Sequence, residues 1–446
     1  MHLTLLNLTD DPIICSWDPN RKDYDKHLVL ASRIPLEAKV PKRCRKLALF
    51  SQAAIKETEG WCPAMVQFSM RAGITWQRLS VEDGHPWSVY AVKMAMNHRK
   101  LIILPKRNVS AFLSDMPDMS PLYSLLLPGT HDTMAFYGWP ISQCQSPSTP
   151  LAVQLQSGIR VVDIRLAVIS SRLIAYHGIY PERTPFEDMQ RTIYTFLIAP
   201  ETCRETIVMF MKQEDFATTE PSTFSRTVHE EMSNGPGGRD MWFLENRVPT
   251  LGEVRGKVVL ISRFGGNGDG WEGGLEGLGI HPTTWPDSAK DGFTWECKDT
   301  HVRTHDWYAI PSFLSIPEKF ALSTEILMHP LDDQPQKTLS ITFFSAASFP
   351  LATPPTVARG FGWPRWGLGV EGVNSRVGRW LLDLLSSSGD VSGHDLQNDL
   401  IKPILGVETR LRGWALMDFY SDPGHALAGL LVECNYRGRR AGEEGW

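Results

Sequence analysis

Two histidines in this chain stand beside residues that suit proton transfer. His131 is followed by Asp132 in the turn PGTHDT at 128–133, and His177 ends an apolar run. Because the ordinary imidazole pKa is about 6.5, one ring can begin neutral and another charged at physiological pH. The pair can therefore act as general base and general acid, and we expect Asp132 and Asp418 to orient the rings.

Charged side chains also end the neighbouring apolar runs. Asp163 and Arg165 close one run, Lys212 closes a second and Arg263 a third. Fixed cations can hold a phosphate while its charge redistributes, so these residue types together are typical of phosphoryl transfer. Asp163 is either a direct ligand or a buried partner of Arg165. Glu214 is interpreted as a surface carboxylate.

These residues need a scaffold that brings the ends of several strands together. After residue 112 the chain alternates strand-like apolar runs, such as 206–211, with segments of helical spacing, such as 186–197. Strands that alternate with helices predict a parallel sheet covered by helices. We expect an α/β fold of the distorted (β/α)8 TIM-barrel type, with functional groups at the carboxyl ends of the strands.

Residues 1–112 have a different pattern, with short alternating runs separated by turn signals. This spacing predicts a small all-β domain of sandwich type. The charge also differs, because 17 basic and 10 acidic residues precede position 113, whereas 28 basic and 40 acidic residues follow. We predict two domains, 1–112 and 113–446, the first able to dock on a membrane or a partner.

The composition excludes several classes of protein. With 446 residues, 42% of them hydrophobic, and a net charge of −5, the chain is globular and not disordered. No run approaches the roughly 18 apolar residues of a membrane-spanning helix. The seven cysteines include no C-x-x-C pair, which argues against a disulfide framework or a zinc knuckle. The amino terminus lacks a signal-peptide pattern, so we expect a cytoplasmic location.

Several motifs, in order along residues 115–435, resemble the X-region of bacterial-type phosphatidylinositol-specific phospholipase C. They are PGTHDT at 128–133, CQ at 144–145, QLQSGIRVVDIR at 154–165, YHG at 176–178, ETIVMFMK at 205–212, GKVVLISR at 256–263, WPD at 285–287, DWY at 306–308 and RGWALMD at 412–418. The ordered set is specific, whereas PGTHD alone is less so. The resemblance implies a barrel phosphodiesterase that acts on phosphatidylinositol in a membrane.

The resemblance also implies a role for each matched residue. His131, oriented by Asp418, would deprotonate the inositol 2-hydroxyl, which attacks phosphorus. Arg165 would neutralise the phosphate oxygens, and His177 with Asp132 would protonate the departing diacylglycerol oxygen. The products would be diacylglycerol and inositol 1,2-cyclic phosphate.

Further matches concern the sugar and the metal. Lys212, Arg263 and Asp306 match positions that hold inositol hydroxyls, and Tyr308 matches a ring that stacks on the sugar. Calcium needs several oxygen ligands, whereas Arg165 and Lys212 place cations where calcium-dependent relatives carry acidic residues. We therefore expect cleavage with no metal and no other cofactor.

Two departures from the bacterial pattern leave alternatives open. Leu166 and Ala167 follow Arg165 where the pattern has Gly-Arg, and a Gly- and Trp-rich insert spans 264–291. The insert lacks the strand and helix of a nucleotide-binding motif. The alternatives are a phosphodiesterase acting on another glycerophospholipid or a glycosylated inositol lipid, and a catalytically silent lipid-binding scaffold.

Aromatic residues in Pro- and Gly-rich loops suit a membrane interface. Phe361, Trp363 and Trp366 lie in such a loop, and Phe136 and Trp139 follow the first barrel strand. The alternative is that these rings pack against the neighbouring domain. We predict a peripheral membrane protein that is a monomer and has no nucleic-acid partner.

Overall fold

The computed structural model describes residues 1–17, 27–41, 44–51, 63–70, 73–82, 84–265, 279–328, 337–363, 368–387 and 410–439. By their contacts these residues divide into two compact units. The first holds the residues up to Arg107 with 363, 368–369 and 378–387, and the second holds 108–362, 370–377 and the residues from Arg410 on. The predicted boundary after residue 112 falls inside the 3₁₀ helix η2 (Val109–Asp115), which packs in the core of the second unit.

The first unit contains two sheets that share one apolar core. Their strand orders are β4-β1-β9-β8-β7 and β3-β2-β5-β6, and among the described strands only β1 and β9 pair in parallel. Alternate residues, such as Leu3 and Leu5 in one sheet and Leu47 and Leu49 in the other, enter the core. The strands are β1 (His2–Asn7), β2 (Ile13–Ser16), β3 (Leu28–Leu30), β4 (Leu36–Lys39), β5 (Lys46–Ser51), β6 (Ala64–Gln67), β7 (Trp76–Leu79), β8 (Trp87–Ala95) and β9 (His98–Pro105).

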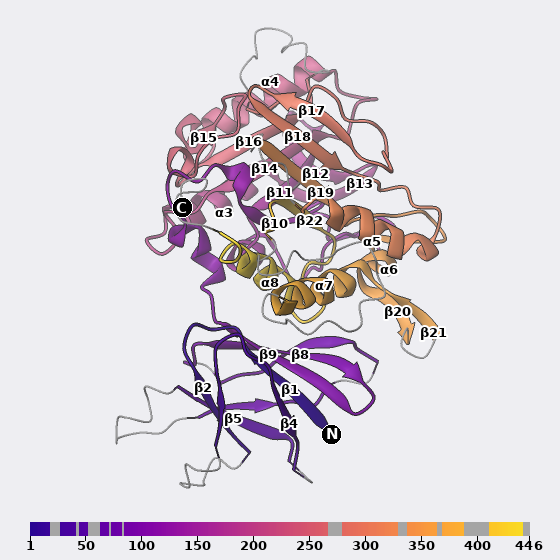
Figure 1. Cartoon of the computed structure of the whole chain (residues 1–446). Coiled ribbons are helices and arrows are strands. Elements are labelled where there is room, and N and C mark those ends of the chain that lie inside the picture. The colour runs from indigo at the N-terminus through magenta and orange to yellow at the C-terminus, as the bar shows by residue number, and fades with distance from the viewer. Residues whose placement is uncertain are drawn as a thin grey trace. The chain divides into compact units, whose positions relative to one another are not determined.

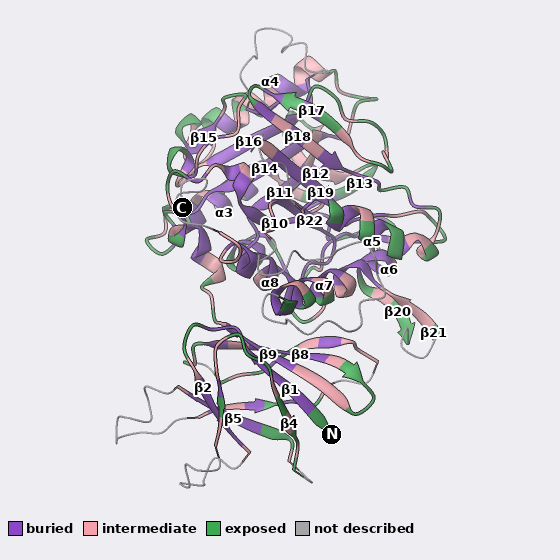
Figure 2. Ribbon diagram, in the orientation of Figure 1, coloured by how far each residue is buried: buried purple, intermediate pink, exposed green. Residues whose placement is uncertain are grey.

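The second unit is built on one long sheet with the order β15-β16-β14-β11-β10-β22-β19-β18-β17, in which every pairing but the last is parallel. Its strands are β10 (Leu126–Thr130), β11 (Val161–Ile169), β14 (Ile207–Gln213), β15 (Trp242–Phe243), β16 (Val258–Arg263), β17 (Phe293–Cys297), β18 (Thr300–His305), β19 (Thr338–Phe343) and β22 (Gly413–Met417). The hairpin β12 (Arg172–His177) and β13 (Tyr180–Pro185) extends β11. The central strands are almost wholly buried (Figure 2).

Helices alternate with these strands along the chain (Figure 1). They are α2 (Leu151–Gln156), α3 (Phe186–Ile198), α4 (Pro221–Asn234), α5 (Ile316–Glu325), α6 (Pro354–Arg359), α7 (Val373–Ser387) and α8 (Leu427–Cys434), and a two-stranded sheet joins β20 (Gly360–Trp363) to β21 (Leu368–Glu371). The 3₁₀ helices after η2 are η3 (Leu122–Ser124), η4 (Arg239–Met241), η5 (Gly252–Val254) and η7 (Phe313–Ser315). Within the described ranges, no helix combines the length and the apolarity that a membrane crossing requires.

Aromatic contacts show that the long sheet curls on itself. Phe210 lies on β14 and Phe343 on β19, with three strands between them in the sheet order, yet their ring centroids are 6.2 Å apart. Trp414 of β22 lies 6.3 Å from Phe210. Trp285 contacts Phe210 and Phe343 at 6.2 and 6.0 Å. The rings therefore fill the inside of a curved α/β sheet, as expected for a barrel-type fold.

A buried ion pair joins the elements at the edge where the strands begin. Arg160, just before β11, donates from Nε to Glu205 Oε2 at 2.8 Å, and neither side chain is exposed. Glu205 also accepts hydrogen bonds from the backbone of Leu113 and Ser114. Because a buried charge without a partner is costly, this pair ties η2 to the starts of β11 and β14.

Breaking this ion pair should destabilise the second unit. We expect Glu205→Gln to lower the free energy of unfolding by about 3–5 kcal/mol, since it leaves the Arg160 guanidinium buried and unpaired. The control is Glu187→Gln, which removes an exposed partner of Arg172 and should change stability by less than about 0.5 kcal/mol. Urea unfolding measures both, and similar values for the two variants would contradict the structural role of Glu205.

Candidate active site

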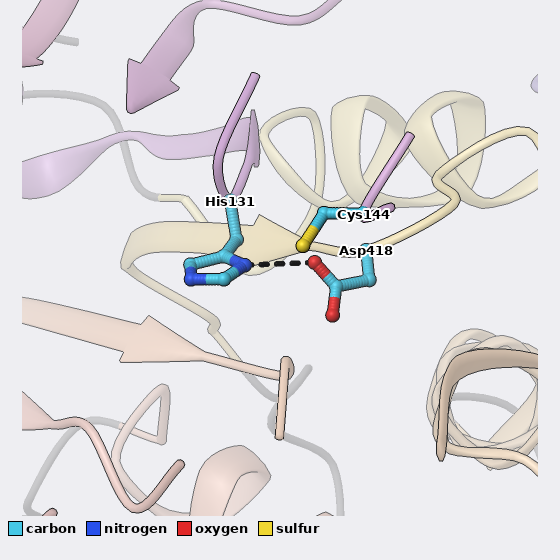
Figure 3. Close-up of side chains that lie close together, drawn as sticks. All are labelled: His131, Cys144 and Asp418. Carbon is cyan, nitrogen blue, oxygen red and sulfur yellow. Dashed lines mark hydrogen bonds and ion pairs between the residues drawn. The ribbon is translucent and has the colours of Figure 1, made fainter. Parts of the chain in front are cut away.

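His131 and Asp418 follow neighbouring strands at the carboxyl edge of the sheet. Thr130 of β10 pairs with Met417 of β22, so the next residue of each strand lies side by side. His131 Nδ1 is 2.8 Å from Asp418 Oδ1, and Figure 3 shows the ring directed at the carboxylate. These two residues are far apart in the sequence, and the parallel register brings them together.

The turns that carry this pair are held firmly. Asp132 has a φ of 43° and Phe419 a φ of 44°, in the left-handed region that costs a non-glycine residue roughly 1–3 kcal/mol. Gln145 Nε2 donates to the carbonyl oxygens of His131 and Met417 at 2.8 and 2.9 Å, which cross-links the two turns. The backbone strain and the hydrogen bonds that offset it therefore both occur next to His131 and Asp418.

Arg165 lies at the centre of the predicted set. Its Nη2 is 2.6 Å from His131 Nε2 and 3.2 Å from Asp163 Oδ2. It also approaches Asp132 and Glu214, at 3.6 and 3.7 Å. Because a guanidinium can only donate, His131 Nε2 accepts, so Nδ1 carries the proton and donates to Asp418.

The charges around His131 change its proton affinity. Burial lowers the pKa of His131, but the Asp418 and Asp163 carboxylates outweigh burial and the repulsion of Arg165, so its pKa is raised overall. Burial would raise the pKa of Asp163, yet Arg165, His131 and Arg263 hold that pKa well below its usual range. Asp163 therefore stays ionised and supports the cation next to the histidine.

His177 forms a second pair with a carboxylate. Its Nδ1 lies 3.2 Å from Asp132 Oδ2 and 2.7 Å from the carbonyl oxygen of Ser142. Burial is the largest effect on Asp132 and raises its pKa, although His177 and Arg165 oppose the shift. The structure thus brings His131, Asp418, Arg165, Asp132 and His177 into one cluster.

The interpretation of Glu214 as a surface carboxylate is wrong. Its side chain is only 9% exposed, and Oε1 accepts from Lys212 Nζ at 2.9 Å. Its other oxygen accepts from the backbone of Gly178 at 3.2 Å, immediately after His177. Burial and the neighbouring Arg165 lower the pKa of Lys212, although Glu214 opposes this shift. Glu214 therefore connects the cations to the His177 turn.

Of the remaining predicted residues, Arg263 ends β16 beside Lys212 of β14, and Asp306 and Tyr308 follow β18. The Arg263 guanidinium stacks on Trp285 with its carbon 3.9 Å from the ring centroid, and the indole donates to Asp306 Oδ2 at 2.9 Å. The Tyr308 hydroxyl donates to Asp287. An aromatic ring, a cation and a carboxylate thus meet at this edge of the sheet, an arrangement that can hold a sugar.

Sequence reasoning missed a buried lysine below this site. Lys319 of α5 is wholly buried, and burial lowers its pKa to about 7, while Asp306 and Asp418 oppose the shift. It shares a helix face with Ser323, whose hydroxyl contacts His305 Nδ1 at 3.2 Å. The only signal in the sequence was a lysine at helical spacing from Ile316, on the buried side of the helix.

The aromatic residues predicted at the rim have different surroundings. Phe136 is only 9% exposed and lines a cavity of about 330 Å³, because its backbone folds back onto Glu182, so its assignment to the interface is corrected. Trp139 and Phe361 are exposed. Trp363 is exposed too but belongs to the first unit, and Trp366 lies outside the described residues.

Comparison with known proteins confirms the resemblance found in the motifs. The chain is 32% identical over 164 residues to a 1-phosphatidylinositol phosphodiesterase of Listeria monocytogenes, covering 34% of this chain and 48% of that protein. It is 29% identical over 162 residues to the Staphylococcus aureus (strain Newman) protein of that name, covering 35% and 51%. The chain therefore spans about half the length of these curated relatives. No family model matches the chain.

Solved structures extend the similarity to the fold. Two structures of S. aureus phosphatidylinositol-specific phospholipase C, from work on its membrane binding, superpose with TM-scores of 0.53 and 0.54. They are 19% and 20% identical to this chain, and each alignment covers 74% of it and 98% of the solved chain. This similarity shows a shared barrel-type α/β fold.

The buried lysine predicts a pH-dependent stability. The Lys319 pKa, about 7 in the folded protein, lies below its ordinary value of 10.5, so the unfolded chain binds more protons between these values and stability rises with pH. We expect Lys319→Met to flatten this rise, which amounts to at most about 1.4 kcal/mol per pH unit. Unfolding at pH 7.5 and 9.5 measures it, with Lys290→Met, an exposed lysine, as control. A parallel rise in Lys319→Met would contradict the assignment.

Proposed function

We propose that the protein is a phosphatidylinositol-specific phospholipase C. The observation that carries the proposal is the pair of histidine–carboxylate contacts, His131 with Asp418 and His177 with Asp132, on the two sides of Arg165. A base, an acid and a fixed cation are what intramolecular phosphoryl transfer requires. Binding alone needs neither acid nor base, so the arrangement favours an enzyme over a silent scaffold.

The first half of the reaction uses His131. Its neutral ring, with the proton on Nδ1 toward Asp418, leaves Nε2 free to take the proton of the inositol 2-hydroxyl once substrate reaches Arg165. Asp418 then stabilises the imidazolium that forms. Arg165 binds the phosphate oxygens as negative charge develops on them.

The second half uses His177. Held by Asp132 and the Ser142 carbonyl, its Nδ1 carries a proton, and Nε2–H can protonate the departing diacylglycerol oxygen. The products are diacylglycerol and inositol 1,2-cyclic phosphate. Lys212, Arg263 and Asp306 hold the inositol hydroxyls, and Tyr308 packs on the ring.

The same cations support cleavage without a metal or other cofactor. Arg165 and Lys212 occupy the phosphate side of the site, and both interact with Glu214. A divalent cation needs several carboxylate oxygens there, whereas these two positive groups supply charge stabilisation themselves. Asp163, hydrogen-bonded to Arg165, is a positioning residue in this proposal.

We also propose that residues 1–107 form a β-sandwich-like domain that docks on anionic membranes. Two sheets around a single core support the sandwich, and the excess of basic residues in this segment supports the docking. The protein would then be a cytoplasmic monomer that associates peripherally with membranes.

Phosphorus NMR with phosphatidylinositol vesicles tests the reaction. We expect the wild type to give a cyclic phosphate signal that persists in excess chelator, and His131→Ala to lose at least about 10²-fold in rate, because its general base is gone. Glu187→Gln, an exposed change, should keep the wild-type rate. Cleavage of another phosphodiester lipid but not of phosphatidylinositol would favour the alternative substrates. Cleavage of no lipid would leave the catalytically silent scaffold as the remaining hypothesis.

Exposed apolar side chains near the site support membrane contact and give a second test. Trp139, Ile179 and Phe349 lie on loops at the edge that carries the site, and all are exposed. Trp139→Ala should weaken vesicle binding about tenfold or more, since burying such a side chain contributes about 1.5–3 kcal/mol. Cleavage of a soluble inositol phosphodiester should stay unchanged.

The matched control for this test is Ile198→Ala. Ile198 is also exposed, at 57%, but ends α3, before the start of β14 and hence at the opposite edge of the sheet. Vesicle binding, measured by cosedimentation, should not change in this variant. An equal loss of vesicle binding in both variants would count against membrane contact at this edge of the sheet. So would an equal loss of activity on vesicles and on the soluble substrate in Trp139→Ala.

A further inference from the structure

A cysteine that the proposed reaction does not use lies beside both histidine–carboxylate pairs. Cys144 is wholly buried, and Figure 3 shows its sulfur next to the His131–Asp418 contact. Its Sγ is within 4.8 Å of ligand atoms of that pair and, equally, of Asp132 and His177. One thiol could therefore complete either of two three-residue metal sets.

The second set has nearly the spacing of a tetrahedral zinc site. Zinc bonds of about 2.3 Å to sulfur and about 2.0–2.1 Å to nitrogen and oxygen place neighbouring ligand atoms roughly 3.3–3.6 Å apart. Here His177 Nδ1 lies 3.2 Å from Asp132 Oδ2 and 3.9 Å from Cys144 Sγ. Small shifts of these side chains would seat the ion, which would replace the 2.7 Å contact of His177 Nδ1 with the Ser142 carbonyl oxygen.

Two further features select this set. Asp132 Oδ2 is buried, meets no hydrogen-bond geometry with a described residue and lies 3.2 Å from His177 Nδ1, so two of the ligand atoms already face each other. In the other set, metal on His131 Nδ1 would move the proton to Nε2, only 2.6 Å from the donor Arg165 Nη2. His177 Nε2 has no such contact with a described residue. Its side chain is 23% exposed, which gives the ion a route of entry.

We propose that Cys144, His177 and Asp132 form an inhibitory site for Zn²⁺. This inference rests on the proposed function for its effect on activity. The ion bonds to Cys144 Sγ, and the thiol proton leaves to solvent. It also bonds to His177 Nδ1, whose proton leaves to solvent while Nε2 keeps its own, and to one Asp132 oxygen.

Binding would remove the proposed acid from the reaction. Zinc takes the place of the proton on Nδ1, so His177 can no longer become an imidazolium, and Asp132 no longer supports its charge. Arg165, 3.6 Å from Asp132, opposes a divalent ion. Three ligands, one of them a thiolate, offset this repulsion for zinc but not for Mg²⁺, which prefers oxygen ligands alone.

Cobalt binding tests the site without using activity. Co²⁺ in place of zinc should give the thiolate-to-metal absorption band in the wild type, and added Zn²⁺ should remove it. The band should be lost in Cys144→Ser and His177→Ala but kept in His131→Ala, which removes only the other set. Cys203→Ser, at an exposed cysteine, should keep it. A band that persists in Cys144→Ser, or one that needs His131, would overturn the proposal.

The activity measurement adds the functional effect. Zn²⁺ should inhibit cleavage, and a chelator should restore the rate. The same concentration of Mg²⁺ should not inhibit. Measured against its own rate without zinc, Cys144→Ser should need at least about tenfold more Zn²⁺ for the same inhibition. A tenfold loss of metal affinity is the smallest that changes even to the outer contacts of a metal site usually cause. Equal sensitivity would overturn the inhibitory role. Circular dichroism checks folding, and Cys144→Ala serves if the serine variant unfolds. If the wild type cleaves no phosphatidylinositol, the proposed function fails, yet the cobalt result still decides the metal site.

Discussion

The need to compensate one buried guanidinium determines the arrangement of the site. Arg165 is held almost out of water, and an isolated charge there would cost several kcal/mol. Asp163, Asp132 and Glu214 surround it and keep it charged. Two of these carboxylates also touch another functional group: Asp132 contacts His177, and Glu214 contacts Lys212 and the turn after His177. The positions of the two histidines therefore follow from the same ionic network.

Much of this network could be predicted from the sequence, because its members follow apolar runs that become parallel strands. The pairing of His131 with Asp418, across most of the barrel in sequence, followed from the expectation that strand ends meet at one edge and from the matched motifs. Glu214 carried an overlooked signal: two residues after Lys212 on a strand, it must share a face with that lysine.

Other features depend on contacts that no local pattern contains. Phe136 is buried because Glu182, from β13, accepts hydrogen bonds from the backbone around it and pulls the loop inward. Lys319 lies under the site because α5 packs its polar Ser323 against His305, which places the neighbouring lysine in the interior. In both cases a distant element decides how deeply the residue is buried.

The aromatic rings inside the barrel limit the route by which molecules reach and leave the site. Phe210, Phe343 and Trp414 are wholly buried and occupy the interior below His131, whose ring lies 6.0 Å from that of Phe343. In the described part of the chain they close the interior beneath the histidines, so we expect a molecule to reach and leave His131 by the carboxyl edge of the sheet. An apolar product and a water-soluble product would then share one exit, and the slower of the two departures would set the interval before the next substrate enters.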